Sequence, residues 1–206
     1  MLFVSGFDEM EAKMTCLGAQ GASCLFVTDE NTYPIYEKLL HRSATDNDCQ
    51  ESRPCPVLVL QAGEAHKGIT QVIRIWDFLH EHQASRHSLL VAIGGGTISD
   101  LAGFAAATYK RGMHYVNMPT TLLSMVDASI GGKTGFNLHN IKNEIGCFYP
   151  PEETVICPEV LLTLPRKEWL SGYAEMLKHA LIADTDEWWE LLRMAEEDMP
   201  QTAPAI

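Results

Sequence analysis

The sequence predicts an α/β fold in which a Rossmann-like, doubly wound parallel sheet is followed by the first helices of a truncated all-α second domain. From about residue 24 to residue 130, short apolar runs alternate with longer stretches of helical spacing. Beyond about residue 158 the strand-like runs stop and only helical spacing remains. Strict alternation of strand and helix is typical of a parallel sheet. We therefore expect a sheet domain over residues 1–157 and the start of a helical domain over residues 158–206.

Four strands are expected where the apolar runs are short. They are Cys24–Thr28, Val57–Gln61, Ser88–Ile93 and His114–Met118. The third run is apolar from Leu89 onward, which is typical of a strand buried on both faces of a parallel sheet.

Six helices are expected from apolar residues that recur at helical spacing. In the second of them, Val72, Trp76 and Leu79 fall on one face. The six are Tyr33–His41, Gly68–Gln83, Ser99–Tyr109, Thr120–Ser129, Arg166–Ala183 and Asp186–Asp198. The polar segment Ser43–Pro56 holds two prolines and predicts a surface insertion. We expect the tail Pro200–Ile206 to be disordered.

Composition and charge limit the classes of partner. The 206 residues carry a net charge of −12 and a pI near 5.0. Nucleic-acid binding needs a basic face, so this charge argues against such a partner. An anionic small molecule remains compatible, because clustered lysines can oppose the global charge locally. No run reaches the ~18 apolar residues of a membrane helix, and Met1–Glu11 is acidic without the basic flank of a signal peptide.

The six cysteines form no Cys-x-x-Cys pair, and their spacing suggests neither a zinc cage nor a disulfide framework. They are Cys16, Cys24, Cys49, Cys55, Cys147 and Cys157. We expect reduced thiols in a cytoplasmic protein.

Three glycines, Gly94–Gly96, join the strand ending at Ile93 to the following helix. Glycine can adopt positive φ and let the backbone approach a ligand, and the amides of a helix N-terminus attract an anion such as a pyrophosphate. The usual dinucleotide fingerprint wants a third glycine or alanine where Ser99 stands, and an acid about 20 residues on, where Val116 and Asn117 stand. The alternative is a tight turn that binds no ligand.

Polar and basic residues concentrate between residues 110 and 142. Four of the chain's 15 basic residues lie there, namely Lys110, Arg111, Lys133 and Lys142. The hydroxyls of Thr120 and Thr121 suit either a helix cap or contact with a ribose or phosphate. Loops after the carboxyl ends of parallel strands are where such sheets bind ligands. We therefore expect a binding site here, and the alternative is an ordinary solvated surface with turn glycines.

Eight motifs then follow one another along the chain. They are Gly63–Lys67, Gly94–Phe104, Tyr109–Gly112, Pro119–Asp127, Gly131–Thr134, Lys142–Asn143, Thr163–Pro165 and Ala174–Lys178. In this order and spacing they resemble the 3-dehydroquinate synthases, over most of the chain from Val27 to Asp184. The iron-type alcohol and glycerol dehydrogenases share only the general layout, whereas other sugar-phosphate cyclases are separated less sharply.

The resemblance implies that NAD lies across the sheet at these loops. Asp29 and Asn31 match the residues that meet the adenosine ribose, which would explain the missing acid after Gly96. Glu64 and Lys67 match the next NAD contact. The other matching cofactor positions are Gly95, Gly96, Asp100, Thr120, Thr121, Lys133, Lys142 and Thr163.

The resemblance also implies the substrate, 3-deoxy-arabino-heptulosonate 7-phosphate, whose two anionic groups need cations. Four residues match substrate-binding positions, namely Asp127, Lys133, Asn143 and Lys178. Arg111 matches an arginine that reaches the phosphate in the neighbouring subunit, which implies a homodimer.

Glu175 matches the family's carboxylate ligand of a zinc or cobalt ion. Lys178, three residues later, would share its helix face. His179 lies four residues after Glu175, but the family does not use that position, so we interpret it as a partly exposed helix histidine. A catalytic zinc usually has three protein ligands. The resemblance implies that the other two are histidines in the later helical domain, so these 206 residues supply only Glu175. We therefore expect that these 206 residues alone bind zinc poorly and do not turn over.

In the family, NAD transiently oxidises the hydroxyl at C5 of the substrate. Phosphate is eliminated, the ketone is reduced again, the ring opens and an internal aldol closes the carbocycle. The resemblance thus implies a phosphate-eliminating lyase of the shikimate pathway with catalytic NAD and a divalent metal. The family's opening strands are not evident at the N-terminus. The alternatives are another sugar-phosphate cyclase, a polyol dehydrogenase or a non-catalytic dinucleotide-binding remnant.

Overall fold

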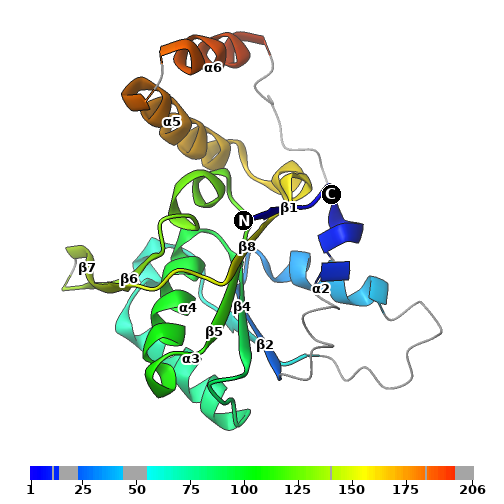
Figure 1. The fold of residues 1–206 in the computed structure, drawn as a ribbon, viewed down its shortest axis with the longest axis vertical. Coiled ribbons are helices and arrows are strands. Elements are labelled where there is room, and N and C mark those ends of the chain that lie inside the picture. Colours follow the sequence, from blue (N-terminus) through cyan, green and yellow to red (C-terminus); the bar gives the residue numbers. More distant parts are fainter. Residues whose placement is uncertain (11, 14–22, 44–54, 140, 184, 198–206) are drawn as a thin grey trace.

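A six-stranded parallel sheet forms the centre of the molecule in a computed structural model that describes residues 1–10, 12–13, 23–43, 55–139, 141–183 and 185–197 (Figure 1). The strand order is β1-β8-β5-β4-β2-β3, and every neighbouring pair is parallel. The α/β, Rossmann-like fold expected from the alternating pattern is therefore confirmed.

The four predicted strands are all present, with bounds within a residue or two of the expected ones. They are β2 (Cys24–Asp29), β3 (Val57–Leu60), β4 (Leu89–Gly94) and β5 (His114–Pro119). Every residue of β4 is buried, as its apolar sequence predicts. Two further strands, β1 (Leu2–Phe3) and β8 (Glu153–Ile156), were not predicted. Leu2 pairs with Val155, so the N-terminal residues do add a short strand to the sheet.

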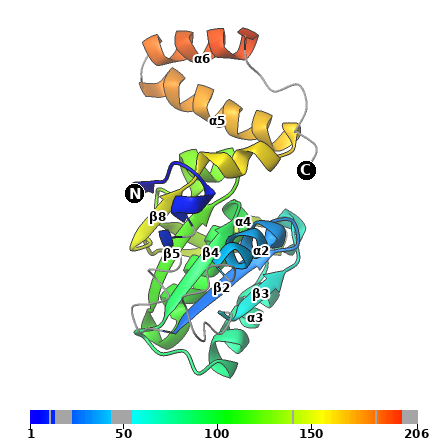
Figure 2. The same cartoon turned by 90° about the vertical axis from the view of Figure 1, so that its right-hand side faces the viewer.

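Helices cover both faces of the sheet (Figures 1 and 2). On one face α2 (Tyr33–Ser43) and the helical residues that start at Phe7 pack on β2, β4 and β5. On the other face lie α3 (Ile69–Glu81) and α4 (Gly96–Thr108). One apolar layer therefore lies on each side of the strands, as in other doubly wound sheets.

An antiparallel hairpin, which the sequence pattern did not predict, joins β6 (Lys133–Leu138) to β7 (Ile141–Phe148). Strand β6 packs on α4, and most of β7 is exposed. The pairing register shifts between Phe136 and Leu138, and Asn143 of β7 has a φ of 53°. A register shift of this kind re-aims side chains, and asparagine tolerates this left-handed conformation better than most residues.

The predicted helix over Thr120–Ser129 is largely replaced by a wider helical turn. Only η3 (Ser124–Ala128), a π-helical turn, follows two α-helical residues. Such turns are rare and frequently occur at functional sites. The prediction of one regular α-helix was therefore wrong here, because the spacing of apolar residues cannot reveal an i→i+5 hydrogen-bond pattern.

Beyond β8 the chain is helical, as expected. A 3-10 segment, η4 (Pro158–Thr163), leads into α5 (Arg166–Ala183) and α6 (Thr185–Glu197). Both views show α5 and α6 as a pair beyond one end of the sheet (Figures 1 and 2). The predicted domain boundary falls between β8 and η4, although Val160 and Leu161 of η4 still pack into the sheet core. None of the described helices has the length and apolar character needed to cross a bilayer.

Two predicted segments lie wholly or mostly outside the described residues, namely the insertion Ser43–Pro56 and the tail Pro200–Ile206. So do Cys16 and Cys49. The other four cysteines are free thiols, and Cys24 and Cys157 are buried. Burial raises the pKa of the Cys24 thiol to about 12, so this thiol stays protonated and packs as a small apolar group.

Gly103 allows α4 to lie close to β5 and β6. A Cβ atom at this position would lie 2.5 Å from Cγ2 of the buried Thr134 and 3.0 Å from the Tyr115 hydroxyl. We expect Gly103→Ala to lower the free energy of unfolding by about 1–3 kcal/mol through overpacking, despite the better helix propensity of alanine. Urea unfolding measures this. Gly131→Ala is the control, because a Cβ at Gly131 meets nothing within 4 Å; equal effects of the two changes would contradict the packing argument.

Candidate dinucleotide and metal site

The sheet has a topological switch point between β2 and β4. From β2 the chain moves outward to β3, returns to β4 on the other side of β2, and then continues to β5 and β8. Doubly wound sheets bind ligands outside the carboxyl ends of the strands at such a point. Asp29 ends β2 and Gly94 ends β4, so two predicted cofactor segments flank the switch point.

The glycine turn is confirmed as the junction of β4 and α4, but the reason for its glycines differs from the predicted one. Positive φ values occur at Gly63, Gly112 and Gly132, and not at Gly94–Gly96. Close packing is the cause. A Cβ on Gly94 would lie 2.6 Å from Ile98, and one on Gly95 would lie 3.0 Å from Thr121. Gly95 is the N-cap residue of α4 and provides no side-chain cap, which leaves the first backbone amides of the helix available to an anion.

Asp29 organises the turn after β2. Its Oδ1 accepts hydrogen bonds from the Asn31 amide at 3.0 Å, the Thr32 amide at 2.9 Å and the Thr32 hydroxyl at 2.9 Å. The Thr32 hydroxyl lies 3.2 Å from the Ile93 carbonyl oxygen, which ties the turn to β4. Within the described residues these bonds all use Oδ1, so Oδ2 is the oxygen that can accept a bond from a ligand hydroxyl. Asn31 is exposed beside it.

A buried lysine joins three predicted site residues. Lys67 Nζ donates to Asp100 Oδ2 at 2.5 Å and to Asn143 Oδ1 at 2.6 Å, and the Lys67 side chain is only 5% exposed. Asp100 lies in α4 and Asn143 in β7, so Lys67 links the glycine-turn helix to the hairpin. Burial raises the pKa of Asp100, Lys67 opposes this shift, and the nearby charges of Glu64 and Asp127 add to it.

Asn137, which the sequence analysis missed, holds the hairpin in this place. Its Nδ2 donates to Glu64 Oε1 at 2.9 Å, and its Oδ1 accepts from the Asn143 amide at 2.9 Å. Its own amide donates to the Lys67 carbonyl oxygen at 2.7 Å. Lys142 Nζ lies 3.9 Å from Glu64 Oε1 and is 75% exposed, so this ion pair is weak. Asn137 stands outside every motif of the family resemblance, so no signal in the sequence marked it.

Removing the Asn137 amide should release the hairpin without unfolding the sheet. We expect Asn137→Ala to cost about 1–2 kcal/mol, because two hydrogen bonds to its side chain are lost at an exposed position. Hydrogen exchange should accelerate at residues 141–148 and stay unchanged in β2, β4 and β5. Glu144→Gln, a change at an exposed position on β7, is the control. Unchanged exchange in β7 of Asn137→Ala would refute this role.

The threonines predicted to meet the cofactor fall into two groups. The hydroxyls of Thr121 and Thr163 have internal partners, at 2.9 Å from Ser124 Oγ and 2.9 Å from the Val160 carbonyl oxygen. Thr121 thus serves as a local cap, which was one of its two predicted roles. Thr120 is 2% exposed, and its Oγ1 has no hydrogen-bond partner among the described residues. A buried hydroxyl without a partner at the switch-point edge fits a site that a polar ligand completes.

Three side chains of types that can bind a metal converge between η3 and α5. Ligand atoms of Asp127, Glu175 and His179 all lie within 4.8 Å of one another. Lys178 Nζ contacts Glu175 Oε1, and His179 Nε2 lies 3.1 Å from the same oxygen. The hydrogen bond from Lys178 is the main cause of the lowered pKa of Glu175, with His179 contributing. The predicted shared face of Glu175 and Lys178 is therefore present.

Gly172 sets the distance between α5 and η3 and was also missed. A Cβ at this position would lie 2.5 Å from the Leu123 backbone nitrogen and 2.6 Å from Leu122 Cβ. Because backbone atoms cannot give way as a flexible side chain can, only glycine permits this approach. A glycine inside a helix indicates a close helix contact only when the residue packed against it is known. The spacing of residues in the sequence does not reveal that neighbour.

The remaining predicted site residues are exposed and are not joined to these clusters by hydrogen bonds among the described residues. Lys133 begins β6. Arg111 lies in η2 (Tyr109–Arg111) with a φ of 69°.

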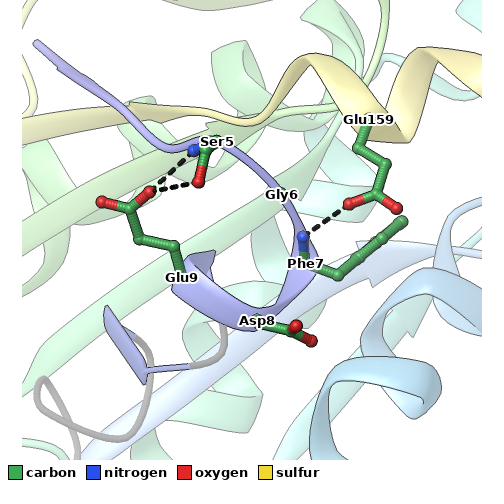
Figure 3. A pocket seen from close by; sticks show the side chains of 6 residues that line it. All are labelled: Ser5, Gly6, Phe7, Asp8, Glu9 and Glu159. Atoms are coloured by element: carbon green, nitrogen blue, oxygen red, sulfur yellow. Dashed lines mark hydrogen bonds between the residues drawn. The ribbon is translucent and has the colours of Figure 1, made fainter.

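A hollow of about 370 Å³ lies at the N-terminal turn, lined by residues 5–9 and Glu159 (Figure 3). Glu159 Oε2 accepts from the Phe7 amide at 2.7 Å, and Glu9 accepts from Ser5. Its three carboxylates, on Asp8, Glu9 and Glu159, give it a negative character, and it contains none of the predicted site residues. It is therefore no candidate for an anionic cofactor.

Comparisons with known proteins bear on this arrangement. The model of the 3-dehydroquinate synthase N-terminal family matches residues 57–171. A 3-dehydroquinate synthase of Parabacteroides distasonis is 45% identical over 161 residues, which are 78% of this chain and 43% of the relative. The chain spans about half the length of the curated relatives it matches.

Two solved structures extend the comparison. The 2-epi-5-epi-valiolone synthase of Streptomyces hygroscopicus subsp. jinggangensis, with NAD+ and Zn2+ bound, is 27% identical with a TM-score of 0.73, covering 94% of this chain and 58% of its own. A 2-deoxy-scyllo-inosose synthase in complex with carbaglucose-6-phosphate, NAD+ and Co2+ is 26% identical with a TM-score of 0.75, covering 89% of this chain and 49% of its own.

The family match takes in the Lys67 cluster and Asp127, and it ends at residue 171 in α5, before Glu175 and His179. Strands β3, β4, β5 and β8, the glycine turn and the hairpin lie inside it, whereas β1 and β2 precede it. By sequence and by fold, this chain belongs to the 3-dehydroquinate synthase family.

Proposed function

We propose that this chain forms the NAD-binding part, and the Glu175-bearing part, of a 3-dehydroquinate synthase. The reaction would convert 3-deoxy-arabino-heptulosonate 7-phosphate to 3-dehydroquinate and phosphate. One observation carries the proposal. Residues from four separate segments meet at the carboxyl edge of the sheet, where Lys67 bridges Asp100 and Asn143, and the charge of Asp127 reaches Asp100. The dinucleotide region and the candidate metal cluster are thus neighbours.

The residues at the switch point fit a dinucleotide. The uncapped amides of α4 suit a pyrophosphate, and the second oxygen of Asp29 suits a ribose hydroxyl. The buried hydroxyl of Thr120 has no hydrogen-bond partner within the described residues, and a polar ligand can supply one. The NAD+ bound in the structures of two relatives supports the same assignment.

The donor set at η3 and α5 fits a divalent cation. Carboxylate oxygens and an imidazole nitrogen are ligands that zinc and cobalt accept. When bound, NAD supplies a hydride acceptor and the metal polarises substrate oxygens. The chain's own residues bind and orient the substrate. Lys178 and Lys133 offer ammonium groups to its anionic groups, and Asn143, held by Lys67, offers its amide.

Calorimetry with a panel of sugar phosphates tests the proposal. With NAD+ and Co2+ present, we expect 3-deoxy-arabino-heptulosonate 7-phosphate to bind roughly tenfold or more tighter than glucose 6-phosphate or sedoheptulose 7-phosphate. Tighter binding of either of the other two would support a different sugar-phosphate cyclase. Binding of NAD+ without binding of any sugar phosphate would support the non-catalytic alternative.

The predicted homodimer stays a proposal that rests on Arg111. Arg111 lies in η2, just after α4, with an exposed side chain and a left-handed backbone conformation. From this position an arginine can meet a phosphate held by a second copy. Light scattering coupled to size exclusion measures the oligomeric state. A monomer at all concentrations would refute this part alone.

A further inference from the structure

Asn137 lies where the pairing of β6 with β7 is interrupted. Residues 142–144 of β7 stand opposite Asn137 alone, because the register shifts between Phe136 and Leu138. An irregularity of this kind leaves backbone groups unpaired and re-aims a side chain. Here the Asn137 side chain supplies the missing partner, since its Oδ1 accepts a hydrogen bond from the Asn143 backbone amide at 2.9 Å. One side chain therefore fixes the backbone at Asn143.

The side-chain amide of Asn143 has an orientation that its neighbours determine. Its Oδ1 lies 2.6 Å from Lys67 Nζ, and an ammonium group can only donate a hydrogen bond. The oxygen must therefore face Lys67, and the Nδ2 group must point elsewhere. Asn143 is exposed, and within the described residues no hydrogen bond uses its Nδ2 group. This residue thus presents an N–H donor that suits an anionic or hydroxyl oxygen of a ligand.

Asn137 also contacts the segment that carries two of the predicted cofactor residues. Its Nδ2 donates to Glu64 Oε1 at 2.9 Å, and its backbone amide donates to the Lys67 carbonyl oxygen at 2.7 Å. Because Lys67 donates to Asn143, and Asn143 donates to Asn137, these three residues form a closed ring of hydrogen bonds. Lys67 further ties the ring to Asp100 of α4. Asn137 is therefore the residue that joins the candidate cofactor segment to Asn143 on the hairpin.

We propose that Asn137 is a positioning residue that couples the binding of the dinucleotide to the binding of the sugar-phosphate substrate. The inference rests on the proposed function, in which the dinucleotide lies beside Glu64 and Lys67 and the substrate meets Asn143. A dinucleotide that contacts Glu64 or Lys67 orders the ring, and the ordered ring holds the Nδ2 group of Asn143 in place for the substrate. Each ligand then reduces the ordering that the other must produce, which is a reciprocal coupling between two sites.

Calorimetry of the whole chain measures this coupling. The chain is titrated with 3-deoxy-arabino-heptulosonate 7-phosphate with and without saturating NAD+, at one constant Co2+ concentration. We expect NAD+ to tighten substrate binding in the wild type by about tenfold, within the range of common couplings between sites. In Asn137→Ala this factor should fall below about twofold. Glu144→Gln, at an exposed position on β7, is the control and should keep the wild-type factor.

A second variant, Asn137→Asp, separates the two contacts of the side chain. A carboxylate still accepts the hydrogen bond from the Asn143 amide, but it cannot donate to Glu64 and it repels the charge of Glu64. We expect this variant to bind the substrate alone within about threefold of the wild type, and to lose the effect of NAD+. A general loss of stability weakens both titrations alike, so a merely structural role would leave their ratio unchanged.

The outcomes separate this inference from the proposed function. If NAD+ tightens substrate binding as much in Asn137→Ala as in the wild type, Asn137 only stabilises the hairpin and the inference is wrong. If the wild type binds NAD+ and the substrate independently of each other, the inference is wrong while the proposed function stands. If the wild type binds neither ligand, the proposed function fails and the inference fails with it. Thermal melts confirm that each variant is folded at the titration temperature.

Discussion

Replacing Lys67 with methionine is expected to lower the free energy of unfolding by about 3–5 kcal/mol, because it removes one partner of a buried ion pair and leaves the other charged. Lys67 is 5% exposed and Asp100 16% exposed, so water cannot replace the lost partner cheaply. The hairpin also loses its bond from Lys67 to Asn143. Urea unfolding measures the loss, and NAD+ affinity measured at temperatures where the variant is folded should fall with it.

Two further variants isolate the cause. Lys142→Met removes a lysine from a solvent-exposed ion pair with Glu64, and should cost less than about 1 kcal/mol. The double variant Lys67→Met with Asp100→Asn removes both charges and should recover part of the lost stability. A double variant as unstable as the sum of the single changes would show that the ion pair is not the source of the effect.

The stability loss in Lys67→Met should depend on pH in a defined direction. Burial already raises the pKa of Asp100, and Lys67 is what opposes that shift. Without Lys67 the folded protein binds a proton at Asp100 more tightly than the unfolded chain does, so stability falls as pH rises through the window from the usual aspartate pKa to the raised one. The difference between wild type and Lys67→Met should therefore shrink on acidification. A difference that widens at low pH would contradict this assignment.

Gly172→Ala should separate α5 from η3 and weaken cation binding. Alanine is favoured over glycine in a helix by about 1 kcal/mol, but its Cβ would lie 2.5 Å from a backbone nitrogen. Overpacking costs about 1–3 kcal/mol, so we expect a net loss of stability of about 1–2 kcal/mol. Because Asp127 and Glu175 then move apart, Co2+ affinity should fall too. Ser171→Ala, at the exposed neighbouring position, is the control. A Gly172→Ala variant that is more stable than wild type would contradict this packing.

The sheet was predictable because its strands and helices differ in apolar spacing, and β4 in particular is apolar throughout. The hairpin was not. Gly135 and Gly146 face each other so closely that a Cβ on Gly135 would lie 2.3 Å from the Ile145 carbonyl oxygen. Such glycines interrupt the alternation by which strands are recognised. The short strands β1 and β8 were missed for a related reason, because a segment of two to four residues is too short to show an alternation of apolar and polar side chains.

Site residues were predictable where a sequence motif or a helical spacing indicated them. The spacing of Glu175 and Lys178 correctly placed both on one face. Asn137 was not predictable, because its partner Glu64 is 73 residues away in the sequence and meets it only when the hairpin folds over α4. His179 is 45% exposed on α5, as its interpretation as a partly exposed helix histidine predicts, but the sequence does not show that Asp127 approaches it from another element. Long-range convergence is the information that a single sequence lacks.

Hydrogen exchange with and without saturating NAD+ tests the central claim most directly, namely that a dinucleotide binds at the sheet edge held together by Lys67. The account predicts added protection in three segments that are distant in sequence and adjacent in the fold, residues 63–67, 94–100 and 141–148. Protection confined to α5 and α6, or no protection at all, would contradict it.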